Sequence, residues 1–134
     1  MKRYVFDSYA IIAFLENEPG AHIVEKALSE ITTQKAKGFL SVINWGEIYY
    51  TVMREQGKAV AEKVVQHIAN YNLTFIEADL SLTKVAARLK GRYHIAYADC
   101  FAAALAKQQD ASVLTGDPEF KQLEKEVHII WLLD

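Results

Sequence analysis

The sequence predicts a three-layer α/β/α fold with a parallel central sheet of about five strands. Two observations support this class: short runs rich in Val, Ile and Phe recur along the chain, and segments with helical periodicity separate them, several in pairs. A bundle of helices alone would leave those β-rich runs unexplained. The chain has 134 residues, 51% of them hydrophobic, and no visible repeat or linker, so we expect a single domain over residues 1–134.

The first quarter of the chain contains one expected strand and two expected helices. The short apolar run Tyr4-Val5-Phe6 predicts a strand over residues 3–6. Asp7 or Ser8 can cap the helix that follows over residues 9–15. After a Pro-Gly pair, residues 20–35 carry apolar side chains at spacings of three and four, which predicts a helix with one buried stripe.

The rest of the chain continues the alternation. Residues 39–42 are apolar and resemble a strand that is buried on both faces. Helical patterns follow over residues 43–53 and 58–70, and then a strand over residues 73–76. The remaining elements are two helices, expected over residues 81–90 and 97–108, and two strands, expected over residues 112–115 and 128–131.

Charge and cysteine content limit the function classes. The chain has 15 basic and 17 acidic residues, a formal net charge of −2, so its total charge does not indicate nucleic-acid binding. Its single cysteine, Cys100, cannot form an internal disulfide, and the sequence has neither a signal-peptide pattern nor an apolar run of membrane-spanning length. We therefore expect a cytoplasmic protein without a membrane partner.

Four acidic residues occupy equivalent places in this pattern. Asp7 ends the first strand, Asp117 lies just beyond a later strand, and Glu47 and Asp99 lie near the starts of two helices. In a parallel sheet all of these places belong to the edge formed by the carboxyl ends of the strands. No matching basic residues lie nearby in sequence, so the carboxylates would repel one another, and a divalent cation would remove that repulsion.

The alternative to a shared site is that each acid has its own local structural role. Asp7 could be a plain helix cap, and Glu47 and Asp99 could complement the dipole in the first turns of their helices. Asp117, which precedes a proline, could simply open a turn. Four independent caps would not need to share one edge, so their joint placement favours a site.

A set of carboxylate ligands indicates Mg²⁺ or Mn²⁺, because both prefer hard oxygen donors. Zinc fits poorly, since no Cys/His pair has zinc-site spacing. A metal held in this way can activate water against a phosphodiester, so the natural reaction is hydrolysis of a nucleic acid. Ser8 and Thr115 flank two of the acids and could orient a carboxylate or a metal-bound water, although they could equally be cap and turn residues.

The densest basic stretch supplies candidates for RNA binding. Arg88, Lys90 and Arg92, with Lys84 before them, end just before the helix that carries Asp99. Such residues could contact phosphates. We favour a solvated helix face as the simpler explanation of these residues.

Four segments carry a family resemblance: Val5-Phe6-Asp7-Ser8, Ser41-Val42-Ile43-Asn44-Trp45-Gly46-Glu47, Tyr97-Ala98-Asp99-Cys100-Phe101-Ala102-Ala103-Ala104-Leu105-Ala106 and Leu114-Thr115-Gly116-Asp117-Pro118-Glu119-Phe120. Their order and separations resemble those of PIN-domain proteins, and specifically of VapC-type ribonuclease toxins of prokaryotic toxin–antitoxin systems. The resemblance spans essentially the whole chain.

This resemblance implies a PIN-like fold and a Mg²⁺- or Mn²⁺-dependent endoribonuclease that hydrolyses RNA. It also implies a homodimer that is inhibited by a cognate antitoxin, whose tail enters the acidic site. Asp7, Glu47, Asp99 and Asp117 match the four acidic positions of the family. Asp7 and Asp99 are expected to bind the metal directly, and Glu47 and Asp117 partly through water.

Three other functions remain open at this point. PIN domains also act as nucleases in RNA processing and quality control, usually within longer chains. The acidic edge could instead belong to a binding module that captures a basic antitoxin tail without turnover. A phosphatase acting on small phosphomonoesters has less support, since Asp7-Ser8-Tyr9 lacks the second aspartate of an Asp-x-Asp pair.

Overall fold

The computed structural model describes residues 1–133 and contains a five-stranded, fully parallel sheet with the strand order β3-β2-β1-β4-β5. Its strands are β1 (Lys2–Phe6), β2 (Ala36–Ser41), β3 (Thr74–Ile76), β4 (Ser112–Thr115) and β5 (Ile129–Trp131). Its helices are α1 (Ser8–Leu15), α2 (Ala21–Thr32), α3 (Val42–Gln56), α4 (Lys58–Ile68), α5 (Leu80–Arg92) and α6 (Tyr97–Gln109), with two 3₁₀ helices, η1 (Ala69–Tyr71) and η2 (Pro118–Leu123). The predicted α/β class and all five predicted strands are confirmed.

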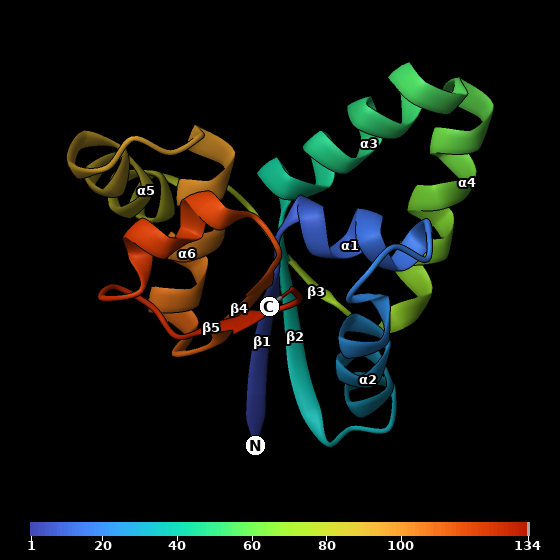
Figure 1. Cartoon of the computed structure of the whole chain (residues 1–134), viewed down its shortest axis with the longest axis horizontal. Helices are drawn as coiled ribbons and strands as arrows, with labels where there is room; N and C mark the ends of the chain where they lie inside the picture. Colours follow the sequence, from blue (N-terminus) through green and yellow to red (C-terminus); the bar gives the residue numbers. More distant parts are fainter. Residues whose placement is uncertain (134) are drawn as a thin grey trace.

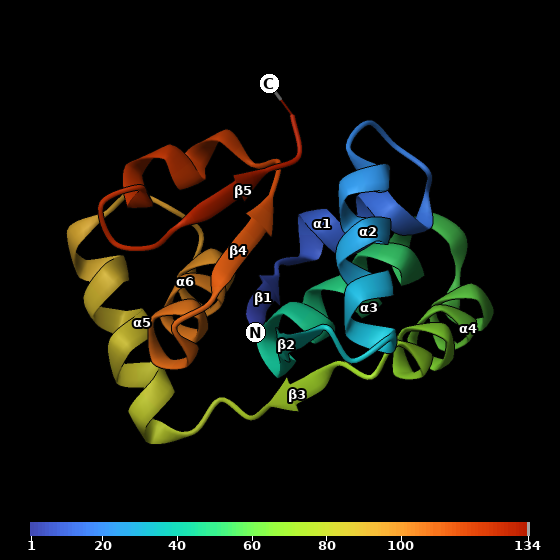
Figure 2. The same cartoon turned by 90° about the horizontal axis from the view of Figure 1, so that it is seen from below.

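Helices cover both faces of the sheet, which gives three layers. Helices α1 to α4 lie on one side, and α5, α6 and η2 lie on the other (Figures 1 and 2). Successive strand residues point to opposite faces, so each central strand contributes to both cores. Phe6, Leu40 and Leu114 pack toward the α1 to α4 layer, whereas Val5, Phe39 and Val113 pack toward the α5 and α6 layer.

The strand order reverses between β1 and β4. The chain winds outward from β1 to β2 to β3 through α1 to α4, and then crosses to β4 through α5 and α6 on the other face (Figure 1). Phe6 pairs with Leu114, so these two strands end side by side. In open α/β sheets, the carboxyl ends of the strands at such a reversal form the usual ligand site.

Helix α6 is the most deeply buried element. It packs against α5, α3 and the strands β1, β2 and β4. Every residue from Asp99 to Ala106 is buried, and the alanines within this run allow neighbouring elements to approach closely. The fold therefore fixes the N-terminal end of α6, which carries Asp99, at the reversal point.

The second strand lies earlier in the chain than the predicted residues 39–42. It begins at Ala36 and ends at Ser41. The hydroxyl of Ser41 accepts a hydrogen bond from the backbone N–H of Ile43 at 3.1 Å. This side-chain cap starts α3 at Val42, although the apolar pattern places Val42 in the strand.

Other boundaries also differ from the predicted ones. Helix α2 ends at Thr32 because Gln34, with φ of 64°, takes a left-handed conformation that stops the helix. Residues 118–123 form η2, which the sequence did not predict, and Asp117 caps it. The predicted helix over residues 58–70 continues as η1 after α4 ends.

No helix within residues 1–133 combines the length and the apolar character needed to cross a membrane.

Gly20 joins α1 to α2 in a left-handed conformation, with φ of 91°. A Cβ atom there would lie 2.7 Å from the Leu132 Cβ and 2.8 Å from the Leu132 carbonyl oxygen. We expect Gly20→Ala to lower the free energy of unfolding by roughly 2–4 kcal/mol, because it combines backbone strain with a clash against backbone. Urea denaturation followed by circular dichroism measures the change.

Gly46→Ala is the matched control for Gly20→Ala. Gly46 lies inside α3, in its second turn, and a Cβ atom there would meet nothing within 4 Å. This substitution should raise the unfolding free energy by about 0.5–1 kcal/mol. An effect of the same size and sign for both variants would contradict the role assigned to Gly20.

Candidate metal centre

Asp7 lies at the carboxyl end of β1 and caps α1. Its side chain is only 1% exposed, and its Oδ1 accepts a hydrogen bond from the backbone N–H of Ala10 at 2.8 Å. Its Oδ2 is also buried and has no hydrogen-bond partner within residues 1–133. An unpaired buried carboxylate oxygen is costly, so the position of this atom favours a proton or a cation beside it.

Asp99 reaches the same region from the first turn of α6. Asp99 is buried, with only 6% of its surface exposed. The turn is held in place by Asn44, a buried residue of α3, whose Nδ2 donates a hydrogen bond to the Ala98 carbonyl oxygen at 3.2 Å. Asn44 therefore ties the helix that carries Glu47 to the helix that carries Asp99.

Glu47 is half-buried in the second turn of α3. The hydroxyl of Ser8 donates a hydrogen bond to its Oε1 at 2.6 Å. Because Ser8 directly follows Asp7 in the chain, this bond couples the position of Glu47 to the end of β1.

Asp117 follows β4 and caps η2. Its backbone N–H donates to the Thr115 hydroxyl at 3.0 Å, and its Oδ1 accepts from the Glu119 N–H at 2.9 Å. These two bonds form a tight turn that points Glu119 in the same direction as Asp117. One carboxylate oxygen from each of Asp99, Asp117 and Glu119 lies within 4.8 Å of the others.

Glu119 is absent from the predicted site. The sequence contained a signal for it, since Glu119 stands two residues after Asp117. In a turn closed by the Asp117 cap, these alternate residues lie on one side.

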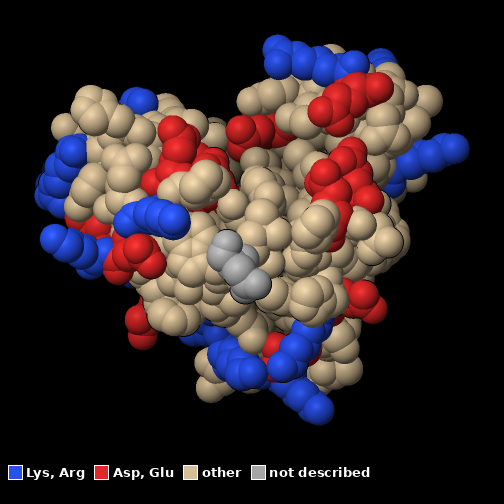
Figure 3. Space-filling model, viewed as in Figure 1, with Lys and Arg blue, Asp and Glu red and all other residues tan. Residues whose placement is uncertain are grey.

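The acids meet in an open cavity of about 350 Å³. Acidic side chains gather around the hollow between the lobe that contains α6 and the lobe that contains α3 (Figure 3). The residues lining the cavity are Ser8, Tyr9, Ile12, Glu18, Glu47, Ala96, Asp99, Asp117 and Glu119. The structure therefore brings Glu47, Asp99 and Asp117 to one cavity, with Asp7 buried behind it.

Burial and mutual repulsion disfavour the charged forms of these acids. Burial raises the pKa of Asp7 to about 7; the nearby Thr115 hydroxyl and the Ala10 N–H oppose the increase, and the charges of Asp117 and Glu47 add to it. The pKa of Asp99 is raised to about 8, first by burial and then by Asp7, Asp117 and Glu47. The three ion pairs within residues 1–133 all lie elsewhere. No basic side chain of the described residues forms an ion pair with the cluster.

This donor set fits a hard divalent cation. The buried Oδ2 of Asp7 and the carboxylates of Asp99, Asp117 and Glu119 would hold the ion, and Glu47 would act beside it. Oxygen ligands of this kind suit Mg²⁺ or Mn²⁺. Positive charge would also offset the desolvation and repulsion that raise the two pKa values.

The predicted RNA-binding residues lie at the end of α5. Lys90 donates a hydrogen bond from Nζ to the Ile95 carbonyl oxygen at 2.7 Å, so it supports the loop that leads into α6. Arg92 forms an ion pair with Glu126, with 3.5 Å between its Nη1 and the Glu126 Oε2, and Arg88 is exposed. Contact of these three residues with RNA stays a prediction.

The raised pKa values lead to a pH dependence of stability. Between the ordinary carboxyl pKa of 3.8 and the folded pKa values of about 7 and 8, the native protein binds more protons than the unfolded chain. In EDTA, the free energy of unfolding should therefore fall as the pH rises through this range. Added Mg²⁺ or Mn²⁺ should restore stability most strongly at the alkaline end. Urea denaturation at pH values from roughly 5 to 8.5, which span the raised pKa values of Asp7 and Asp99, measures both effects.

Asp99→Asn isolates the contribution of the cluster to this profile. The substitution removes one buried charge, so it should raise the unfolding free energy at about pH 8 in EDTA by about 2 kcal/mol and reduce the stabilisation by metal. Asp79→Asn, at the N-cap of α5, is a matched control that should keep the profile of the wild-type protein. A flat profile for the wild-type protein, or a metal effect unchanged in Asp99→Asn, would contradict the assignment.

Comparisons with known proteins agree with this geometry. The family model described as PIN domain matches residues 4–126. A search of curated protein sequences found no significant match. Among solved structures, the chain is similar to VapBC2 from Rickettsia felis bound to a DNA fragment from its promoter, with a TM-score of 0.76, 16% identity and coverage of 96% of this chain and 97% of that one.

Two further structures have the same fold. DNA-bound VapBC from Salmonella typhimurium matches with a TM-score of 0.77 and 14% identity, covering 98% of this chain and 99% of that one. VapC20 from Mycobacterium tuberculosis, described as a toxin that cleaves the sarcin-ricin loop, matches with a TM-score of 0.70 and 12% identity, covering 90% of this chain and 94% of that one. The family match covers most of the sequence, and the sheet and acidic cavity agree with it. The chain therefore belongs to the PIN-domain family.

Proposed function

We propose that this protein is a metal-dependent endoribonuclease and the toxin of a type II toxin–antitoxin pair. The observation that carries the proposal is the group of carboxylates from Asp99, Asp117 and Glu119, which lie within 4.8 Å of one another. The buried Asp7, whose Oδ2 lacks a hydrogen-bond partner within residues 1–133, lies near enough for its charge to raise the pKa of Asp99. A group of acids without basic partners at the reversal point of the sheet suits a cation and the phosphate that it would bind.

The reaction is hydrolysis, in which water adds across one P–O bond of the RNA backbone. Bound Mg²⁺ or Mn²⁺ would supply Lewis acidity and lower the pKa of the attacking water. Asp7 and Asp99 provide fixed oxygens from rigid elements, since both are buried in the core of the fold. Ser8 holds one oxygen of Glu47 and leaves its second oxygen to orient the water or accept its proton.

RNA as the substrate, and an antitoxin as the partner, are supported by the structural neighbours. VapC20 is described as cleaving the sarcin-ricin loop, and the Rickettsia and Salmonella structures contain VapBC complexes. We extend these properties to this chain as part of the proposal, together with a homodimeric state and a cytoplasmic location.

The direct test is cleavage of total cellular RNA by the purified protein in Mg²⁺, Mn²⁺ or EDTA. Discrete fragments should form only with metal. Asp7→Asn and Asp99→Asn should each lower the rate about 100-fold or more, because removing one ligand removes several kcal/mol of transition-state stabilisation. Glu119→Gln should weaken metal binding by about tenfold or more.

Asp79→Asn is the control in this assay as well. It changes the same functional group at a helix cap outside the cavity and should cleave like the wild-type protein. Cleavage that persists in EDTA, or that survives in Asp7→Asn and Asp99→Asn, would refute the proposal. Tight capture of a basic peptide without any turnover would instead support the binding-module alternative.

A further inference from the structure

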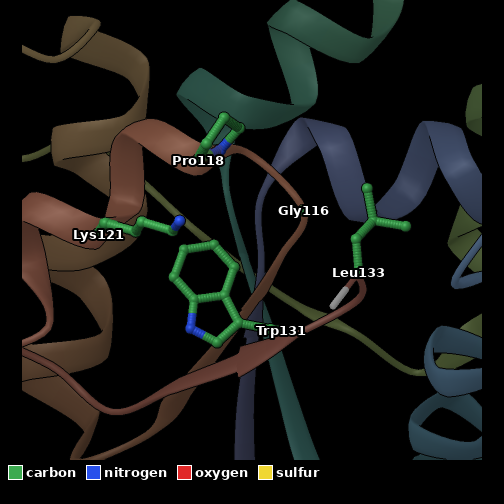
Figure 4. A pocket seen from close by; sticks show the side chains of 5 residues that line it. All are labelled: Gly116, Pro118, Lys121, Trp131 and Leu133. Atoms are coloured by element: carbon green, nitrogen blue, oxygen red, sulfur yellow. The ribbon is translucent and has the colours of Figure 1, made fainter.

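We propose that a second cavity, next to the acidic one, is a subsite for one unpaired base of the RNA strand. The cavity has a volume of about 510 Å³ and is lined by Gly116, Pro118, Lys121, Trp131 and Leu133 (Figure 4). This volume lies in the usual range for small-molecule sites. The inference rests on the proposed function, because it identifies how the same substrate is held beside the acids.

The two cavities share one wall. In the turn after β4, Gly116 and Pro118 line the second cavity, whereas Asp117 and Glu119 line the acidic one. Tyr9, which also lines the acidic cavity, packs so closely on Gly116 that a Cβ atom there would collide with its ring. A strand whose phosphate lies at the acids therefore needs to cross only this turn to reach the second cavity.

Trp131 gives the cavity an aromatic wall. Trp131 is the last residue of β5 and lies on the face of the sheet that η2 covers. Its side chain is only half-buried. Its indole ring stands between Pro118, Lys121 and Leu133 (Figure 4). Every nucleobase has a π-face, so a partly exposed indole ring is a stacking platform that accepts an unpaired base without strict sequence choice.

Lys121 adds a positive charge to this apolar wall. It is exposed on η2, its amine points toward the indole ring, and none of the ion pairs within residues 1–133 involves it (Figure 4). Among residues 1–133, no acidic side chain lines the cavity. An aromatic surface with one free cation complements a base and its adjoining phosphate, whereas a basic peptide would be drawn to the acids across the turn.

A kinetic experiment tests the role of Trp131. We expect Trp131→Leu, which keeps an apolar side chain without the aromatic ring, to raise KM for a single-stranded RNA substrate about tenfold with little change in kcat. Trp131→Phe should restore most of the affinity, because it restores a stacking surface. Trp45→Phe, in the opposite core, should keep the wild-type KM, and urea denaturation of each variant controls for folding.

Lys121 is tested by the salt dependence of the same reaction. Lys121→Ala should flatten the plot of KM against salt concentration, and Lys121→Arg should restore the slope. Lys125→Ala, another exposed lysine just beyond η2, should leave the slope unchanged.

Tryptophan fluorescence measures the binding of RNA at the subsite in a protein that does not cleave it. In a Trp45→Phe/Asp99→Asn protein, Trp131 is the only tryptophan, and oligoadenylate should quench its emission, with Lys121→Ala weakening the effect.

Unchanged KM and cleavage pattern in Trp131→Leu, with no quenching, would overturn the subsite while leaving the nuclease intact. Quenching by a protein partner alone would also overturn it. Quenching by RNA in a protein that never cleaves RNA would retain the subsite and refute the proposed function.

Discussion

The structure depends on holding several carboxylates together at the reversal point of a parallel sheet. Asp7 and Asp99 are both almost fully buried, and each lies in the field of other acids. Such an arrangement is unfavourable unless protons or cations compensate it. The surrounding elements supply the stability that keeps the acids in place: the alanine-rich α6 is buried in the core, and the Asn44 and Ser8 hydrogen bonds join α3 to its neighbours.

The same geometry separates two chemical environments with a single turn. The Thr115 and Asp117 hydrogen bonds hold the turn after β4, in which Gly116 and Pro118 line one cavity and Asp117 and Glu119 line the other. Acids face one cavity, and an aromatic ring with a lysine faces the other. A substrate that carries both phosphates and bases matches this pair of surfaces, because the phosphate and the base of one strand require different partners.

Much of this arrangement could be predicted from the sequence. The strands were predictable because buried parallel strands have short β-rich runs, and the meeting of four acids followed from the topology that such runs imply. Glu119 and Trp131 could not be assigned to a site in this way. Glu119 joins the cluster only because the Asp117 cap folds the turn that contains it. In the sequence alone, Trp131 resembles any other apolar strand residue, and only the packing of β5 beside η2 indicates a site there. The end of β2 was misplaced because apolar Val42 continues the run, although the Ser41 cap begins α3 there.

The most direct test of the central claim is a crystal structure of the protein soaked in Mn²⁺, with the ion located by its anomalous scattering. The account predicts a peak in the acidic cavity at coordination distance, roughly 2.0–2.3 Å, from the Asp7 Oδ2 and from carboxylate oxygens of Asp99 and Asp117. A crystal with no peak among these acids, or with Mn²⁺ bound only at other surface carboxylates, would contradict it.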